Sequence, residues 1–180
     1  DICFPTSDIG YASGRNIMFK TTDGGESWDT LGYQFPGVKI NSCYFPNPDT
    51  GTVVGQMDAF YRTEDGGQTW MEIPASNFRA TAVDMHFPHP DTGFVIGDNS
   101  GSNEFFAFTH DGGQTWNEEV IRSKFLDKIH FISSRIGFSI SGRKLYKTID
   151  GGQNWLEDPN ISGLSANSFE EIDFPSDSVG

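Results

Sequence analysis

Thr21-Thr22-Asp23-Gly24-Gly25-Glu26-Ser27-Trp28 is an eight-residue stretch that the chain writes four times. The later copies run over residues 63–70, 109–116 and 148–155, and all share the frame Thr-x-Asp-Gly-Gly-x-(Ser/Thr)-Trp, with Asn154 the one departure. A frame that returns at a period of about forty residues indicates a repeat architecture. The fold is therefore best derived from one copy.

A second landmark shows that the repeat covers the whole chain. Each copy has a phenylalanine followed six residues later by a glycine; the pairs are Phe4 and Gly10, Phe45 and Gly51, Phe87 and Gly93, Phe131 and Gly137, and Phe174 and Gly180. An insertion over residues 98–104 explains most of the uneven spacing between copies. We expect a single domain whose copies span residues 1–38, 39–79, 80–124 and 125–166, with a fifth copy starting at 167–180.

Each copy has the pattern of four short strands. In the third copy they are expected at 82–87, 93–97, 105–109 and 115–120, separated by turn residues. Four strands in each unit of this length are typical of a propeller blade. We predict an all-β fold, a β-propeller with four complete four-stranded antiparallel blades plus the first strand of a fifth. Copy one already contains its own innermost strand, so a closed ring of four blades would have no place for the extra strand. The extra strand therefore favours a segment of a larger propeller.

The repeated stretch is expected to be a structural turn. Two consecutive glycines can adopt positive φ, the aspartate can accept hydrogen bonds from its own turn, and the tryptophan can cover the blade while its N–H finds a carbonyl. One carboxylate in each copy is too few for a cation that takes six or more oxygen ligands, so we expect no metal or cofactor here. The residues concerned are Thr21, Asp23, Gly24, Gly25, Trp28, Thr63, Asp65, Gly66, Gly67, Trp70, Thr109, Asp111, Gly112, Gly113, Trp116, Thr148, Asp150, Gly151, Gly152 and Trp155.

These four segments resemble the Asp-box (BNR) repeat of β-propellers such as sialidases, xyloglucan-specific endoglucanases, sortilin-type receptors and the lumenal photosystem II assembly factor. The resemblance covers the entire chain. It implies that the boxes are structural turns away from the ligand face, with no catalytic role. It also implies a secreted or cell-surface protein, or a periplasmic or outer-surface one in a bacterium. No arginine here stands in the Arg-(Ile/Val/Leu)-Pro element of the family's sialidases.

Composition excludes several classes of partner. With 12 basic and 25 acidic residues, the net charge of −13 argues against a nucleic acid or an anionic lipid surface. No apolar run approaches the ~18 residues of a membrane span. Cys3 and Cys43 lie one position out of register when the copies are aligned on Phe4 and Phe45. We therefore expect them to face opposite ways and to be unpaired.

The innermost strands carry a polar column in the later copies. Its members are Asp84, His86, Lys128, His130, Glu171 and Asp173. Because the signs of Asp84, Lys128 and Glu171 alternate, ion pairing between neighbouring blades is one hypothesis. The alternative is a site at the channel mouth that uses His86, His130 and Asp173, in which the histidines are the groups that titrate near neutral pH. Metal binding by His86 and His89 is disfavoured, since the Phe87-Pro88 turn does not bring them to one side.

For function we expect a non-enzymatic binding or scaffolding module for a protein or polysaccharide. Candidate contact segments are residues 33–36, 76–79 and 98–104, the last with a weak likeness to a calcium loop. The first alternative is a glycoside hydrolase, xyloglucanase- or sialidase-like, with two carboxylates in an open cleft flanked by aromatics. The second is a filament or adhesin whose open blade edge self-associates.

Overall fold

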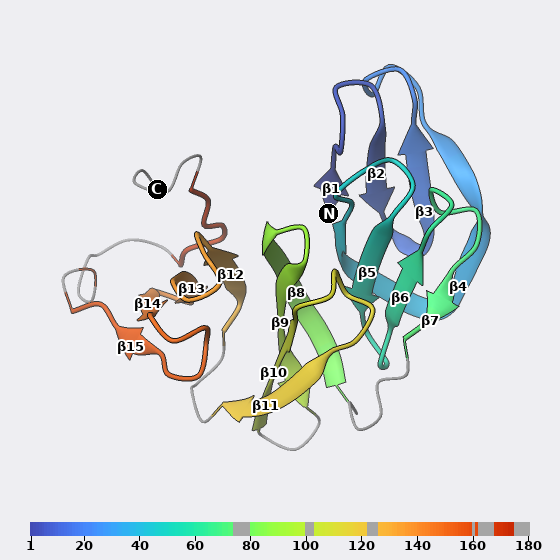
Figure 1. Ribbon diagram of the computed structural model, residues 1–180. Helices are drawn as coiled ribbons and strands as arrows, with labels where there is room; N and C mark the ends of the chain where they lie inside the picture. The colour runs from blue at the N-terminus through green and yellow to red at the C-terminus, as the bar shows by residue number, and fades with distance from the viewer. Residues whose placement is uncertain (74–79, 100–102, 122–125, 160, 162–167, 175–180) are drawn as a thin grey trace. The chain divides into compact units, whose positions relative to one another are not determined.

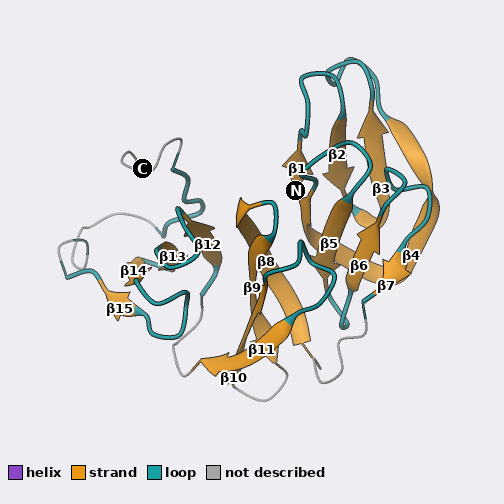
Figure 2. Cartoon of the chain, viewed as in Figure 1, coloured by secondary structure: helices purple, strands orange, loops and turns teal. Residues whose placement is uncertain are grey.

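The computed structural model describes residues 1–73, 80–99, 103–121, 126–159, 161 and 168–174. Over these residues the chain forms strands and connecting loops and no helix (Figures 1 and 2). None of the described residues therefore forms a helix with the length and apolarity of a membrane crossing. The chain divides into two compact units, residues 1–83 and 84–180. We refer to them as the N-terminal and C-terminal units.

The N-terminal unit contains one seven-stranded antiparallel sheet in chain order. Its strands are β1 (Ile2–Cys3), β2 (Gly10–Ser13), β3 (Arg15–Thr21), β4 (Asp29–Tyr44), β5 (Gly51–Gly55), β6 (Phe60–Thr63) and β7 (Met71–Glu72). No turn marks the expected division between blades at residues 38 and 39, because β4 runs across it. The pairing of β4 changes there, from β3 up to Lys39 to β5 from Ile40. Register shifts in both pairings, and Gly37 at φ 79°, absorb the change of direction without a separate turn.

The later copies form two separate four-stranded antiparallel sheets, as expected. The third copy has β8 (Ala80–His89), β9 (Thr92–Asn99), β10 (Asn103–Thr109) and β11 (Asn117–Ile121). The fourth has β12 (Lys128–Phe131), β13 (Gly137–Ser141), β14 (Lys144–Thr148) and β15 (Leu156–Glu157). β11 begins at Asn117 and not at Thr115, because Thr115 and Trp116 still belong to the box turn.

The expected opening strand of a fifth copy is not formed. Residues 168–174 have no strand structure, since no second strand of the described chain pairs with them. They are held to the fourth copy by other contacts: the Phe169 N–H donates to the Gly142 carbonyl at 2.7 Å, and the Phe174 ring stacks on Phe138 at 4.6 Å. The fold is thus all-β with antiparallel sheets, and no sheet in it closes on itself.

A phenylalanine, a glycine and a tryptophan form the core unit of every complete copy. The pairs Phe4–Trp28, Phe45–Trp70, Phe87–Trp116 and Phe131–Trp155 all lie edge to face, with ring centroids 5.8–6.1 Å apart. The glycine six residues after each phenylalanine leaves room for that ring, since a Cβ there would come within 2.3–2.6 Å of it. The spacing of the second landmark is therefore a packing requirement.

Aromatic stacking also joins successive copies inside each unit. Tyr11 stacks on Phe45 at 3.6 Å, and Phe94 stacks on Phe131 at 3.7 Å, both nearly parallel. Tyr11 and Phe94 each follow the glycine of one copy, and their partners are the landmark phenylalanines of the next. In the second and fourth copies, the landmark phenylalanine thus packs both on the tryptophan of its own copy and on an aromatic ring of the preceding copy.

Candidate functional site

The box aspartates are bound within their own turns. Asp65 accepts hydrogen bonds from the Thr63 hydroxyl at 2.8 Å, the Thr69 amide at 2.9 Å and the Thr69 hydroxyl at 2.5 Å. The Thr63 hydroxyl in turn accepts from the Gly67 amide at 2.9 Å, and Gly66 and Gly67 take φ values of 70° and 86°. The hydroxyl and amide of Thr69 lower the pKa of Asp65 to about 2.

The other boxes repeat this network. Asp23, Asp111 and Asp150 accept from the corresponding threonine and from the residue four positions later. In the last box the Asn154 side-chain amide replaces the hydroxyl and donates to Asp150 at 2.8 Å. A carboxylate that already accepts three bonds has little capacity left for a metal ion or a substrate. The geometry is that of a structural turn.

The tryptophan N–H groups follow the sequence expectation only in part. Trp70 donates to the Gly67 carbonyl at 3.1 Å, inside its own box. Trp155 Nε1 is buried without a hydrogen-bond partner among the described residues. Burial of the ring against Phe131 therefore holds Trp155 without the polar contact that we expected.

The polar column joins the innermost strands of the third and fourth copies. Among the described strands β12 pairs only with β13, so alternate N–H groups on its other edge need different acceptors. Asp84 Oδ2 accepts from the Ile129 amide at 2.9 Å, and His86 Nδ1 accepts from the Phe131 amide at 3.2 Å. In the N-terminal unit Asp1 does the same for Cys43, with its Oδ2 2.9 Å from the amide. A side chain of one copy thus caps the strand edge of the next.

Charges alternate along this column as the sequence indicates. Lys128 Nζ lies 3.6 Å from Asp84 Oδ1 and 3.8 Å from Glu171 Oε2. His130 Nδ1 lies 3.5 Å from Asp173 Oδ1, and its ring is 4.1 Å from the ring of His86. All six predicted residues are therefore in contact, as one acid–lysine–acid chain and one His–His–Asp chain.

Burial controls the protonation of the inner members. It raises the pKa of Asp84 to about 6, although the Ile129 amide and Lys128 act in the opposite direction. Burial, with His130 beside it, lowers the pKa of His86 to about 3. His86 is thus neutral, as its acceptor role toward Phe131 requires. Burial also lowers the pKa of His130, against the pull of Asp173 and Glu171.

No three His, Cys, Asp or Glu side chains gather into a possible metal site in the part of the chain that the structure describes. His89 is exposed and lies 3.8 Å from Asp91 Oδ2, so it interacts with its own turn.

A surface cavity of about 550 Å³ lies on the outer strands of the fourth copy. Its lining residues are Lys147, Ile149, Asp150, Asn154, Leu156, Glu157, Asp158 and Pro159. Ile149 and Leu156 are 61% and 72% exposed. Asp150 is held in its box, and Glu157 accepts from Lys144 Nζ at 2.6 Å. None of the described residues that line the cavity is aromatic.

The structure describes the three expected contact segments to different extents. Residues 33–36 belong to strand β4, and Phe35 is buried against Tyr61 and Trp70 at 5.0 and 5.5 Å, so this segment is no exposed loop. Residues 76–79 lie outside the described residues, as do residues 100–102 of the insertion. Asp98 and Glu104 are backbone partners in the β9–β10 ladder.

Sequence reasoning missed the phenylalanine–glycine packing and the capping of one copy's strand edge by the next. The first had a signal, the constant six-residue spacing. The second had a partial one, because Asp1 and Asp84 both stand three residues before a landmark phenylalanine.

The comparisons with known proteins agree with this geometry. A family model described as BNR/Asp-box repeat matches residues 107–118, which include the whole third box. No curated protein matches the chain by sequence. The matching box and the three further copies make this an Asp-box repeat chain.

Solved structures with a similar fold include an ancestral GH74 enzyme, with 18% identity and a TM-score of 0.70 over 86% of this chain and 23% of that one. The GH74 xyloglucanase from Xanthomonas campestris has 12% identity and a TM-score of 0.65 over 84% of this chain and 28% of that one. YCF48 bound to a D1 peptide has 18% identity and a TM-score of 0.53 over 98% and 85%. The chain thus spans about a quarter of the GH74 enzymes and most of YCF48. At these identities the likeness concerns the fold, which is that of propeller proteins.

Proposed function

We propose that this Asp-box repeat chain is a binding module that holds a polypeptide partner and performs no chemistry. The observation that carries the proposal is the state of the acids around the cavity on the fourth copy. Asp150 is bound within its turn and Glu157 is paired with Lys144. A glycoside hydrolase needs two carboxylates free to act across one bond.

The lining of the same cavity favours a polypeptide over a polysaccharide. Sugar rings are commonly bound on aromatic faces, and the lining residues include none. Ile149, Leu156 and Pro159 offer apolar surface, beside acids that outnumber the one lysine. The net charge of −13 adds a field that attracts cations. The partner we infer is therefore a segment with apolar and basic side chains.

The proteins of similar structure support two classes of function, a binding module and an enzyme. YCF48, most of whose length this chain spans, is bound to a peptide, which supports the binding module. The GH74 enzymes support a second candidate, part of a glycoside hydrolase. We also propose that the protein binds its partner outside the cell or at the cell surface.

The test combines binding and turnover. The chain is titrated with two fluorescent peptides of equal length and apolar content, one basic and one acidic, and is incubated separately with xyloglucan and sialyllactose. We expect binding of the basic peptide alone and no sugar release. The double variant Ile149→Ser/Leu156→Ser should lose at least about tenfold in affinity. Met71→Ser is the matched control, because Met71 follows Trp70 as Leu156 follows Trp155 and is 55% exposed.

Release of sugar would replace the proposal with the hydrolase. Equal loss of affinity in the double variant and in Met71→Ser would show that the cavity is not part of the binding surface.

A further inference from the structure

We propose that Cys3 and Cys43 are a cross-linking site, where a disulfide forms between the innermost strands of the first two copies. Their Sγ atoms lie 3.3 Å apart, and both thiols are free in the structure. They are the two cysteines of the chain, so an intramolecular bond can have only this connectivity.

The one-residue offset between the cysteines explains why they meet. Cys3 in β1 and Cys43 in β4 face opposite ways relative to their own copies, as the sequence predicts. Successive copies present opposite faces to each other, and β1 packs against β4. The offset therefore brings the two side chains together, so that two free cysteines lie in contact.

The backbone around the pair is already fixed. Asp1 Oδ2 accepts from the Cys43 amide and from the Ser42 hydroxyl, both at 2.9 Å, which holds β1 beside β4. A disulfide has an S–S distance of about 2.05 Å, so the sulfurs must approach by about 1.3 Å. Small rotations of the two side chains supply this movement without a shift of either strand.

Exposure gives the two thiols different roles. Cys43 is buried, and the contact with Cys3 together with burial raises the pKa of its thiol. Cys3 is only half-buried and is the sulfur that a reagent in solution reaches first. A more accessible attacking thiol beside a protected resolving thiol is the arrangement that disulfide exchange uses.

The oxidant we name is a low-molecular-weight disulfide such as oxidised glutathione. The Cys3 thiolate attacks one of its sulfurs, forms a mixed disulfide and releases one glutathione thiolate. The Cys43 thiol then loses its proton to solvent, attacks the Cys3 sulfur and releases the second glutathione thiolate. Two protein thiols are oxidised, and one glutathione disulfide is reduced to two thiols. The new bond closes a loop between residues 40 positions apart and lies in the core of the N-terminal unit.

The experiment uses the unmodified chain. It is incubated with oxidised glutathione, alkylated under denaturing conditions and weighed intact. We expect loss of two hydrogen atoms, no alkylation, and one proteolytic peptide pair that contains both cysteines. Because closing this loop restricts the unfolded chain, the thermal midpoint should rise by about 5–10 °C over that of the reduced protein.

Two comparisons make the result decisive. Cys43→Ser should stop at the glutathione adduct on Cys3, and the unmodified chain in strong denaturant should form the internal bond far more slowly than the folded chain does. Stable adducts on the unmodified folded chain, two alkylated thiols, or equal rates in both conditions would overturn the proposal.

Discussion

The ring of Phe45 occupies the space where Gly51 would carry a side chain: a Cβ at Gly51 would come 2.3 Å from Phe45 Cε1. Phe45 directly follows β4 and Gly51 begins β5, and the same ring stacks on Tyr11 and meets Trp70 edge-on. One glycine therefore sets the position of a ring that joins two copies.

Gly51→Ala should destabilise the protein by about 1–3 kcal/mol, because the phenylalanine ring must move out of a packed core. Gly32→Ala is the matched control, since Gly32 also lies in a strand and a Cβ there would meet nothing within 4 Å. Urea unfolding measures both. Adding Phe45→Leu to Gly51→Ala should cost less than the sum of the two single changes. Additive costs would show that the ring is not the obstacle.

The Asp-box network gives a second prediction. Asp65→Ala removes the acceptor for the Thr63 hydroxyl and for both donors of Thr69, so we expect a loss of about 1–3 kcal/mol in the free energy of unfolding. Asp29→Ala, at an exposed strand position, should change stability by less than about 0.5 kcal/mol. Chemical denaturation distinguishes them. Similar losses for both variants would mean that lost charge matters and the turn does not.

The boxes could be predicted from the sequence, and the continuity of strand β4 could not. Every bond in a box joins residues two to four positions apart, so the residue types alone define it. Strand β4 is different, because whether Pro36-Gly37 turns the chain or bends a strand depends on the partners β3 and β5. Local chemistry favours both outcomes.

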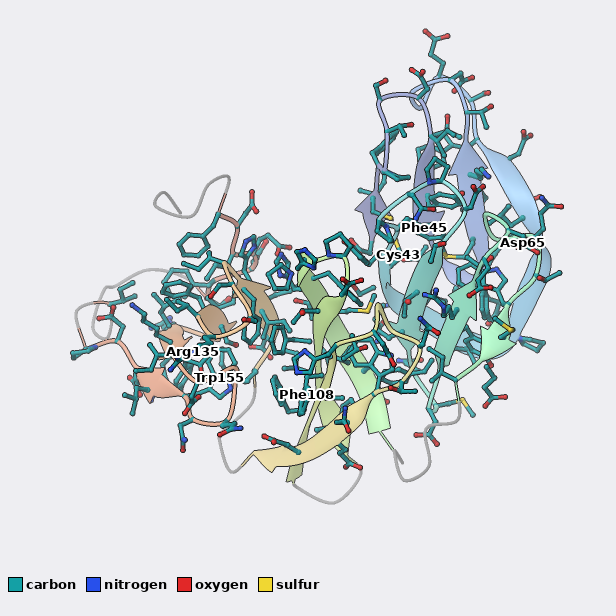
Figure 3. All side chains as sticks on the ribbon, in the orientation of Figure 1. Cys43, Phe45, Asp65, Phe108, Arg135 and Trp155 are labelled. Carbon is teal, nitrogen blue, oxygen red and sulfur yellow. The ribbon has the colours of Figure 1, made fainter. Side chains whose placement is uncertain are left out.

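The contacts between copies also include some that could be predicted from the sequence and some that could not. The alternating charges of Asp84, Lys128 and Glu171 were visible because alignment of the copies places them in one column. The meeting of Cys3 with Cys43 depends on which faces of successive copies oppose each other, and the aligned sequences of the copies do not contain this information. Figure 3 labels Cys43, which lies on β4, and Phe45, which directly follows β4; their partners Cys3 and Tyr11 lie on β1 and β2.

Lys128 supplies the third prediction. Lys128→Met leaves the buried Asp84 without its cation, so stability near pH 8, where Asp84 is ionised, should fall by about 1–3 kcal/mol. Near pH 5 the loss should be much smaller, because Asp84, with a pKa of about 6, can hold a proton instead. Urea unfolding at both pH values gives the comparison. Lys39→Met, at an exposed position, is the control, and an equal loss at both pH values would assign the effect to the lysine stem.

His86 and Asp84 give the fourth prediction. The pKa shift of His86 and the pKa shift of Asp84 change the stability of the folded protein at acid pH in opposite directions. The pKa of His86 is about 3 in the folded protein against 6.5 unfolded, so its contribution to stability is complete above about pH 6.5 and is lost as the pH falls. Asp84 has a folded pKa of about 6 against 3.8, so the folded state keeps a proton that the unfolded state releases. Stability gained from Asp84 therefore increases as the pH falls below about 6.

In the unmodified chain the two effects largely cancel between about pH 6 and pH 4, and His86→Asn separates them. Asparagine keeps an acceptor near the position of Nδ1 for the Phe131 amide but does not titrate. We expect this variant to gain about 1–3 kcal/mol of stability on acidification from about pH 7 to pH 4.5, relative to the unmodified chain. Lys128, Glu171, His130 and Asp173 surround the site in both proteins, so the difference between their curves reports His86 alone. The exposed His89→Asn serves as the control, and parallel curves for His86→Asn and the unmodified chain would show that His86 binds its proton equally well folded and unfolded.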